Sequence, residues 1–209
     1  MKYTIKKDTI RTVVIDTTRD NHECLVETRA DATIVIPVKE YEGKELTVTI
    51  RLVGWGARAT IIGVVVGTKK QIINLHTLQH HEAPETTSNL LVKGVLYDEA
   101  TFVYDGAILV DPKAQKTDAY QRNENLLLSP SAHAKSQPGL EILANDVRCT
   151  HGATIGTLST DQLWYMATRG IGRDVGGRLI SDGFVASALE KITDEKVRDT
   201  VRQQILGGV

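Results

Sequence analysis

The chain has 209 residues, with 25 basic and 26 acidic side chains and a formal net charge of −1. This balance argues against a nucleic-acid-binding surface, which would show as an excess or a stripe of basic residues. No apolar run reaches the ~18 to 20 residues that span a bilayer, and the first residues lack the apolar core of a signal peptide. We therefore expect a cytoplasmic protein with no membrane or nucleic-acid partner.

Residues 1 to about 158 alternate between short apolar runs and turns. The segment 46–52 alternates apolar and polar residues, and this period of two is typical of a half-buried strand. Similar runs lie at 61–66, 71–75, 89–96, 102–110, 125–128 and 140–144. Turn residues such as Pro138-Gly139 separate them. Many short strands without intervening helices predict an all-β architecture.

The pattern alone leaves two architectures open. A sandwich or jelly roll is the commoner way to arrange many short strands. A β-helix is the alternative, because the run Asn-Leu-Leu at 89–91 recurs at 125–127, 36 residues later, and no Asn-Gly hairpin dipeptide lies between.

Near residue 158 the pattern changes to that of helices. Ser159 and a glutamine three residues later fit a capping box, and Gly170 ends the helix that they start. A second helix with one apolar face follows, and Thr193 caps a third. We therefore divide the chain into a β domain, residues 1–158, and a C-terminal helical domain, residues 159–209.

Four segments carry a resemblance to a known family. They are KGVL at 93–96, AQKTDAYQRNENLLLS at 114–129, PGLEILANDVRCTHGAT at 138–154 and DQLWYMATRGI at 161–171. Taken together in this order, they resemble the core of the SufB/SufD family, the scaffolds on which iron–sulfur clusters are assembled.

The resemblance implies a right-handed parallel β-helix followed by a small C-terminal α-helical domain. It implies a scaffold subunit of a SUF-type complex, not an enzyme, on which a transient iron–sulfur cluster is assembled without being held tightly. The implied partners are a SufC-like ABC-type ATPase on the C-terminal helices, a second subunit and a sulfur-donor protein. The second subunit is either a copy of this chain or a SufB-like chain.

Within the family the chain resembles SufD more than SufB. The stretch Cys-Thr-His-Gly-Ala-Thr at 149–154 is of the SufD type, whereas SufB-type chains carry acidic residues around the corresponding histidine. The β pattern begins where the family has a helical N-terminal domain, which indicates a short form. The other cysteine, Cys24, lies outside the matching segments, so sulfur acceptance by this chain stays open. The alternative function is an accessory SufD-like subunit that stabilises the complex or aids iron acquisition without holding a cluster.

Cys149 and His151 are the candidate cluster ligands. Two residues apart on a strand, they leave the same face, about 6.5 to 7 Å apart. Thiolate sulfur and imidazole nitrogen suit iron–sulfur clusters or zinc. Two ligands are too few for a closed site, so the others must come from a partner, and an isologous dimer would supply a second pair. The alternative is that Cys149 fills the core and His151 hydrogen-bonds a turn.

Other polar residues are weaker candidates. Glu141, on the strand before the Cys-x-His segment, is a candidate carboxylate that either binds the metal itself or hydrogen-bonds one of its ligands. His76, His80 and His81 with Glu82 form a cluster of possible ligands, but adjacent residues point apart on a strand, so we interpret the segment as a polar loop. His133, in a turn-rich segment, is expected to be exposed, and Gln115, Lys116 and Gln121 are expected to cap rungs or bind turns.

The C-terminal helices are the predicted docking surface for the ATPase. Its candidate residues are Gln162, Leu163, Tyr165, Arg169, Gly170 and Ile171. In the alternative reading, Trp164, Tyr165 and Phe184 seal the helices onto the β body. The sequence shows no glycine-rich phosphate loop and no serine nucleophile motif, which argues against an enzyme.

Overall fold

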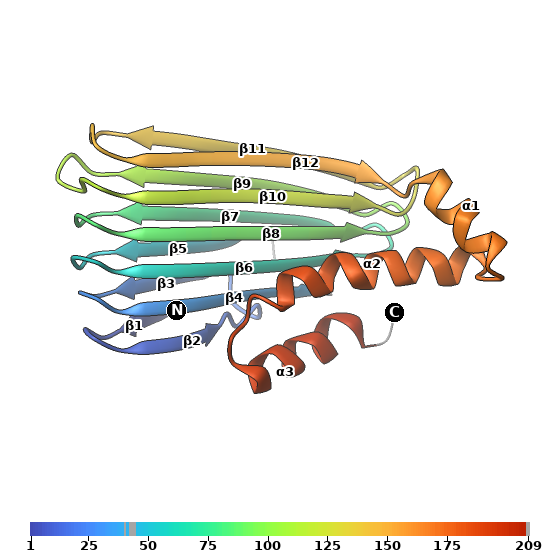
Figure 1. Ribbon diagram of the computed structural model, residues 1–209, viewed down its shortest axis with the longest axis horizontal. Helices are drawn as coiled ribbons and strands as arrows, with labels where there is room; N and C mark the ends of the chain where they lie inside the picture. The colour runs from blue at the N-terminus through green and yellow to red at the C-terminus, as the bar shows by residue number, and fades with distance from the viewer. Residues whose placement is uncertain (40, 42–44, 208–209) are drawn as a thin grey trace.

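The computed structural model describes residues 1–39, 41 and 45–207, and Figure 1 shows a stack of strands with helices against one side. Sheet A contains, in spatial order, β1 (Lys2–Ile5), β3 (Asn21–Val26), β5 (Leu46–Leu52), β7 (Ile72–His81), β9 (Thr101–Val110) and β11 (His133–Ile142). Sheet B contains β2 (Ile10–Val14), β4 (Asp31–Lys39), β6 (Arg58–Gly67), β8 (Thr87–Leu96), β10 (Asp118–Leu127) and β12 (Arg148–Thr157).

Successive strands alternate between the two sheets, and the strand pairs within the described ranges are all parallel. The chain therefore forms a parallel β-helix followed by helices, which confirms the predicted fold and excludes the sandwich. One strand of each sheet makes a rung, from β1–β2 at one end to β11–β12 at the other.

The rungs repeat at a spacing that the sequence did not reveal. From β4 to β10, paired positions of sheet B lie 27, 29 and 31 residues apart. Asn89 pairs with Tyr120, and Asn125 pairs with Gly94. The recurrence after 36 residues is therefore unrelated to the rungs, although the β-helix that it suggested is correct.

One column of turns repeats from rung to rung. Arg29, Glu85 and Lys116 adopt positive φ angles of 53°, 59° and 59°, and Gly56 lies between them in the column with a φ of 65°. Each of the four backbone N–H groups donates to a carbonyl oxygen of the next rung. The residue after each is a buried alanine or threonine, so a small side chain fits where the backbone turns inward.

Several strands extend beyond the apolar runs seen in the sequence, and β7, β10 and β11 do so by the most residues. The interpretation of His76, His80 and His81 as a loop is wrong, because all three lie on β7. Its inward positions include Thr77 and Gln79, so both faces of this strand are partly polar and the alternation is hidden. The first halves of β10 and β11 were missed for the same reason.

The interior changes character along the stack. In the early rungs it is an apolar cluster of aliphatic side chains, with Cys24 among them. Burial raises the pKa of the Cys24 thiol to about 12, so this cysteine is an inert core residue. From β7 onward, amides and hydroxyls replace many of the aliphatic side chains inside.

Three helices follow β12: α1 (Thr160–Thr168), α2 (Arg173–Leu189) and α3 (Glu195–Leu206). Ser159 caps α1 as predicted, because its hydroxyl accepts from the Gln162 N–H. The predicted cap of α3 is wrong by one residue. Asp194, not Thr193, is the cap, since its carboxylate accepts the Val197 N–H at 3.2 Å.

Helices α2 and α3 cover the outer face of sheet B over the C-terminal halves of β4, β6 and β8 (Figure 1). Val35, Ile62, Val64 and Val95 face outward there and pack against apolar residues of the two helices. None of the described helices is long and apolar enough to cross a membrane.

Candidate functional site

The last rung is an open end of the β-helix. Strands β11 and β12 have paired neighbours on one side, and within the described chain no strand pairs with their other side. Leu140, Ile142 and Ile155 are 38 to 49% exposed although they point inward, in register with interior positions of the rung below. The interior is therefore uncovered at this end.

Cys149 and His151 both lie on β12 and face the uncovered interior. Cys149 pairs with Ala119 and His151 with Gln121, and Ala119 and Gln121 are buried inside the stack. Cys149 packs at the edge of a cluster that includes Ile108. The structure thus gives the pair the common face that their spacing predicted, with His151 exposed at the rim.

The environment of Cys149 keeps its sulfur protonated in the isolated chain. Partial burial raises the pKa of its thiol above the ordinary value, and the negative charge of Asp118 raises the pKa further. A hydrogen bond with the Ala119 backbone lowers the pKa but does not offset the effect of burial. A metal ion binds the thiolate, so binding here releases a proton.

Glu141 lies on the other side of its sheet. It pairs with Leu109, whose neighbours Ile108 and Val110 point into the interior, so Leu109 and Glu141 point outward. Within one chain the structure therefore does not bring Glu141 to Cys149 and His151. Among the described residues, no group of three or more His, Cys, Asp or Glu side chains could hold a metal ion.

A polar row that the sequence pattern did not reveal begins directly below His151 and continues along β10, below Ala153 and Ile155. Gln121, Asn123 and Asn125 are buried inward residues of β10. Asn123 donates to the Val92 carbonyl at 3.2 Å and accepts from Asn125 at 2.7 Å. Both amide atoms of Gln121 lack a hydrogen-bond partner. The signal was present as a polar residue at every second position, once 118–127 is recognised as a strand.

The histidines of β7 have separate structural roles. His81 is buried, with Thr86 Oγ1 at 2.7 Å from Nδ1 and Ser88 Oγ at 2.8 Å from Nε2. His80 lies on the outer face, with Nε2 2.9 Å from Asp111 and Nδ1 3.4 Å from Glu82.

His76, His133 and Gln115 are further polar candidates. His76, 3.7 Å from Asp105, and His133, which is exposed, also lie outside the candidate site. Gln115 binds turns as expected, because its amide donates to the Pro112 carbonyl and accepts from the Asp146 N–H.

The predicted docking residues divide into exposed and buried groups. Gln162 and Tyr165 on α1 and Arg169 at its C-cap are exposed, whereas Leu163 is only 7% exposed and packs inward. Trp164 and Tyr165 are 69% and 57% exposed, so they do not seal the helices onto the β body. Phe184 does contribute to the seal, through its ring 4.2 Å from Lys93 Nζ. A pocket of about 430 Å³ between α1 and α2 is lined by Gln162 and Tyr165, among others.

A parallel β-helix with an open last rung that presents a Cys-x-His pair, followed by helices, defines a class of protein. A family model described as the SufBD core domain of SUF-system FeS cluster assembly matches residues 18–184. The chain belongs to the SufB/SufD family of iron–sulfur cluster assembly proteins.

Curated relatives agree with this assignment. The iron–sulfur cluster assembly protein SufD of Escherichia coli is 32% identical over 155 residues, 74% of this chain and 37% of that protein. The chloroplastic protein ABCI7 of Arabidopsis thaliana is 34% identical over 139 residues, 66% of this chain and 29% of that protein. A SufBD family protein of Mycobacterium leprae is 32% identical over 162 residues, 74% and 41% of the two chains. The matches thus span less than half the length of these relatives.

Proposed function

We propose that this chain is a non-catalytic scaffold subunit of a SUF-type complex, in which Cys149 and His151 contribute half of the ligands of a nascent iron–sulfur cluster at a subunit interface. The observation that carries the proposal is the position of the pair. Both side chains face inward on the terminal rung, where the interior is open and a second subunit could reach them.

The chemistry of the pair fits a cluster that is assembled on the scaffold and then released. A thiolate and an imidazole suit iron bound with sulfide. One chain brings together two such donors, so a second subunit must complete the set. An isologous dimer would bring a second Cys149 and His151 to the same axis, and a SufB-like subunit would bring its own donors. Either partner would let the site open for release.

The open end also explains why a subunit should dock there. The unpaired edges of β11 and β12 can accept further strands, and natural proteins rarely leave such edges free. Burial of Leu140, Ile142 and Ile155 would contribute about 25 cal/mol for each Å² of apolar surface removed from water.

The helices supply a separate surface for a SufC-like ATPase. The exposed residues Gln162, Tyr165 and Arg169 line or flank the pocket between α1 and α2, and the loop at Gly170 and Ile171 adjoins them. Leu163 holds α1 in place from its inner side. A sulfur-donor protein would complete the assembly, and in the proposed complex the chain works in the cytoplasm.

One observation favours the alternative of an accessory subunit that stabilises the complex or aids iron acquisition. Glu141 points away, so the described part of the chain groups no third donor with Cys149 and His151. In that case the chain binds the ATPase and holds no iron under any condition.

Anaerobic reconstitution tests the proposal. The chain, alone and with a SufC-like ATPase and a SufB-like subunit, is incubated with ferrous iron and sulfide, and the visible absorbance and bound iron are measured. We expect an oxygen-labile chromophore that Cys149→Ala and His151→Ala each reduce severalfold. Cys24→Ala is the matched control, since it removes the other, buried thiol, and should leave the chromophore intact. An unchanged chromophore in Cys149→Ala would show that the ligand assignment is wrong.

A further inference from the structure

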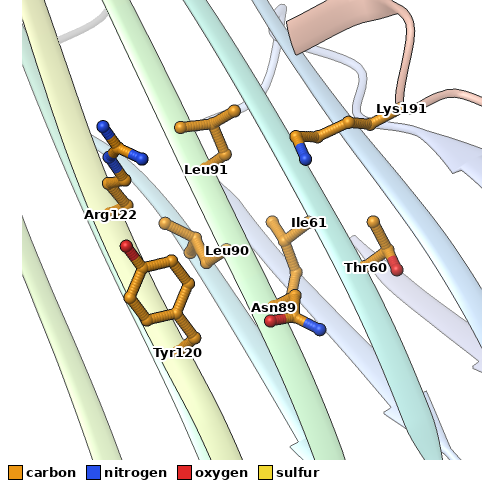
Figure 2. Close-up of a pocket in the computed structure, with 8 residues that line it drawn as sticks. All are labelled: Thr60, Ile61, Asn89, Leu90, Leu91, Tyr120, Arg122 and Lys191. Carbon is orange, nitrogen blue, oxygen red and sulfur yellow. The ribbon is translucent and has the colours of Figure 1, made fainter. Parts of the chain in front are cut away.

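A pocket on the outer face of sheet B belongs to neither of the surfaces described above. Its volume is about 360 Å³, and it lies over β6, β8 and β10 beside the connection from α2 to α3 (Figure 2). The lining side chains are Thr60, Asn89, Leu91, Tyr120, Arg122 and Lys191, with Ile61 and Leu90 beneath them. The sheet separates this pocket from Cys149 and His151, which face the interior.

The floor of the pocket is a polar row that crosses three strands. Thr60 pairs with Asn89, and Asn89 pairs with Tyr120, so their side chains stand next to one another on the outer face. This row offers two hydroxyl groups and an amide to a ligand. Leu91 and the partly exposed ring of Tyr120 add apolar surface beside it.

The charges around the pocket do not cancel. Lys93 and Arg122 share one carboxylate, that of Glu124, with Lys93 Nζ at 3.1 Å from it. Lys191 adds a third cation, for which the described chain provides no ion pair, and none of the described lining residues is acidic. Lys93 lies beside the pocket and not in its lining, so the lining itself carries two positive charges, of which Arg122 is paired with Glu124 and Lys191 is not, in a chain whose net charge is −1. The positive excess is therefore a local feature of this pocket.

The two lining cations stand at different walls. Figure 2 shows Arg122 on one side of Leu91 and Lys191 on the other, from a strand and from the helix connection respectively. Arginine binds planar or tetrahedral oxyanions through two parallel N–H groups, and lysine binds them as a point charge. Two cations at separate walls suit a ligand with two negative charges better than a single ion.

We propose that this pocket binds a small organic dianion, a dicarboxylate or a phosphate ester. Arg122 and Lys191 bind its charged oxygens, the Thr60–Asn89–Tyr120 row binds its remaining polar atoms, and Leu91 contacts its carbon skeleton. The volume lies near the lower end of the range of about 300 to 1,000 Å³ for small-molecule sites, so the ligand is small. This site goes beyond the proposed scaffold function and needs no cluster or partner subunit.

Titration of the isolated chain at low ionic strength tests the proposal. Amide resonances of ¹⁵N-labelled protein are followed as succinate, glycerol 3-phosphate or sulfate is added at matched ionic strength. We expect saturable shifts around residues 60, 89, 120, 122 and 191 with one of the two organic dianions, and the two arms distinguish a dicarboxylate from a phosphate ester. Sulfate should bind at least tenfold more weakly.

Charge-matched variants make the test specific. Arg122→Gln with Lys191→Gln should weaken binding at least tenfold, whereas Arg58→Gln with Lys196→Gln removes the same charge from exposed positions outside the pocket and should leave binding unchanged. If the first double variant does not fold, Lys191→Gln alone, at an exposed position, should still weaken binding severalfold. Absence of saturable binding, equal binding of sulfate, or equal losses in the two double variants would overturn the proposal.

Discussion

Gln121 is the point at which one inward column of side chains turns from apolar to polar. In sheet B this column runs through Ile34, Ile61 and Leu90 to Gln121, and His151 follows on the last rung. The Gln121 amide is fully buried, yet neither of its polar atoms has a partner in the described chain. Burying such a group without hydrogen bonds destabilises the folded state.

Gln121→Leu should therefore stabilise the chain, because leucine already occupies the position one rung below. We expect the free energy of unfolding to rise by about 1 to 2 kcal/mol, the cost of an unsatisfied buried amide. Asn123→Leu is the control: its amide is hydrogen-bonded, so the same substitution should lower stability by about 1 to 3 kcal/mol. Urea unfolding of both variants measures the difference. Equal losses in the two would mean that Gln121 is hydrogen-bonded through buried water.

His81 makes stability depend on pH in a defined window. Burial, and secondarily the charge of His80, lowers the pKa of its imidazole to about 4, against about 6.5 in an unfolded chain. Between these values the unfolded state binds a proton that the folded state does not, so stability falls as the pH falls from 6.5 to 4. Above pH 6.5 this contribution is constant.

His81→Gln should remove that dependence. The stability advantage of the native chain over the variant should shrink by about 3 kcal/mol between pH 7 and pH 4, from 1.36 kcal/mol per pKa unit. Urea unfolding at several pH values measures both chains, and their difference cancels the contribution of the carboxylates. A difference that stays constant across this window would contradict a buried, neutral His81.

At the scale of elements, α2 is attached to sheet B around a buried lysine. Lys93 Nζ donates to Ser187 Oγ at 2.6 Å, lies 3.1 Å from Glu124 and sits over the Phe184 ring at 4.2 Å. Ser187 and Phe184 are on α2, whereas Lys93 and Glu124 are on β8 and β10. One ammonium group therefore connects three elements.

The two partners of this ion pair should respond unequally to substitution. Glu124→Gln leaves a buried cation without its carboxylate and should cost about 3 kcal/mol, whereas Lys93→Met leaves Glu124 paired with Arg122 and should cost about 1 kcal/mol. Hydrogen exchange of the α2 amides, together with denaturant unfolding, measures both effects. Glu195→Gln, at an exposed pair, should change stability by less than about 0.5 kcal/mol. A larger loss in Lys93→Met than in Glu124→Gln would contradict this account.

The sequence predicts those elements whose inward and outward faces differ in polarity. The strand at 46–52 was recognised because its inward positions are aliphatic and its outward positions polar. The first half of β10 was hidden because Gln121 and Asn123 face inward, and that of β11 because Ser136 does, in register with the buried Tyr104. The common face of Cys149 and His151 follows from their spacing alone. The outward direction of Glu141 does not, since it depends on the register of β11 with β9.

For the molecule as a whole, the two ends of the β-helix differ. At the first rung, Ile5, Val13 and Ile15 are buried, and Arg11 reaches across to donate to the Thr4 carbonyl at 3.1 Å. At the last rung, Leu140 and Ile155 point inward yet remain exposed. The polar interior, the Cys-x-His pair and the uncovered apolar residues all occur at the same end. This asymmetry is why we place the proposed subunit interface there.

Ile155→Arg should therefore abolish association through the last rung while leaving the isolated chain folded, because Ile155 is already 49% exposed. A charge there would be buried without a partner in any end-to-end assembly, which costs several kcal/mol and weakens association at least a hundredfold. Thr154→Arg is the control, since the preceding residue lies on the outer face of the same strand, in register with Glu124.

Light scattering measures association of each variant, alone and with a SufB-like subunit, and the rate of Cys149 alkylation reports whether the end is covered. We expect association and thiol protection to persist in Thr154→Arg and to disappear in Ile155→Arg. Equal association of both variants would place the interface elsewhere on the molecule.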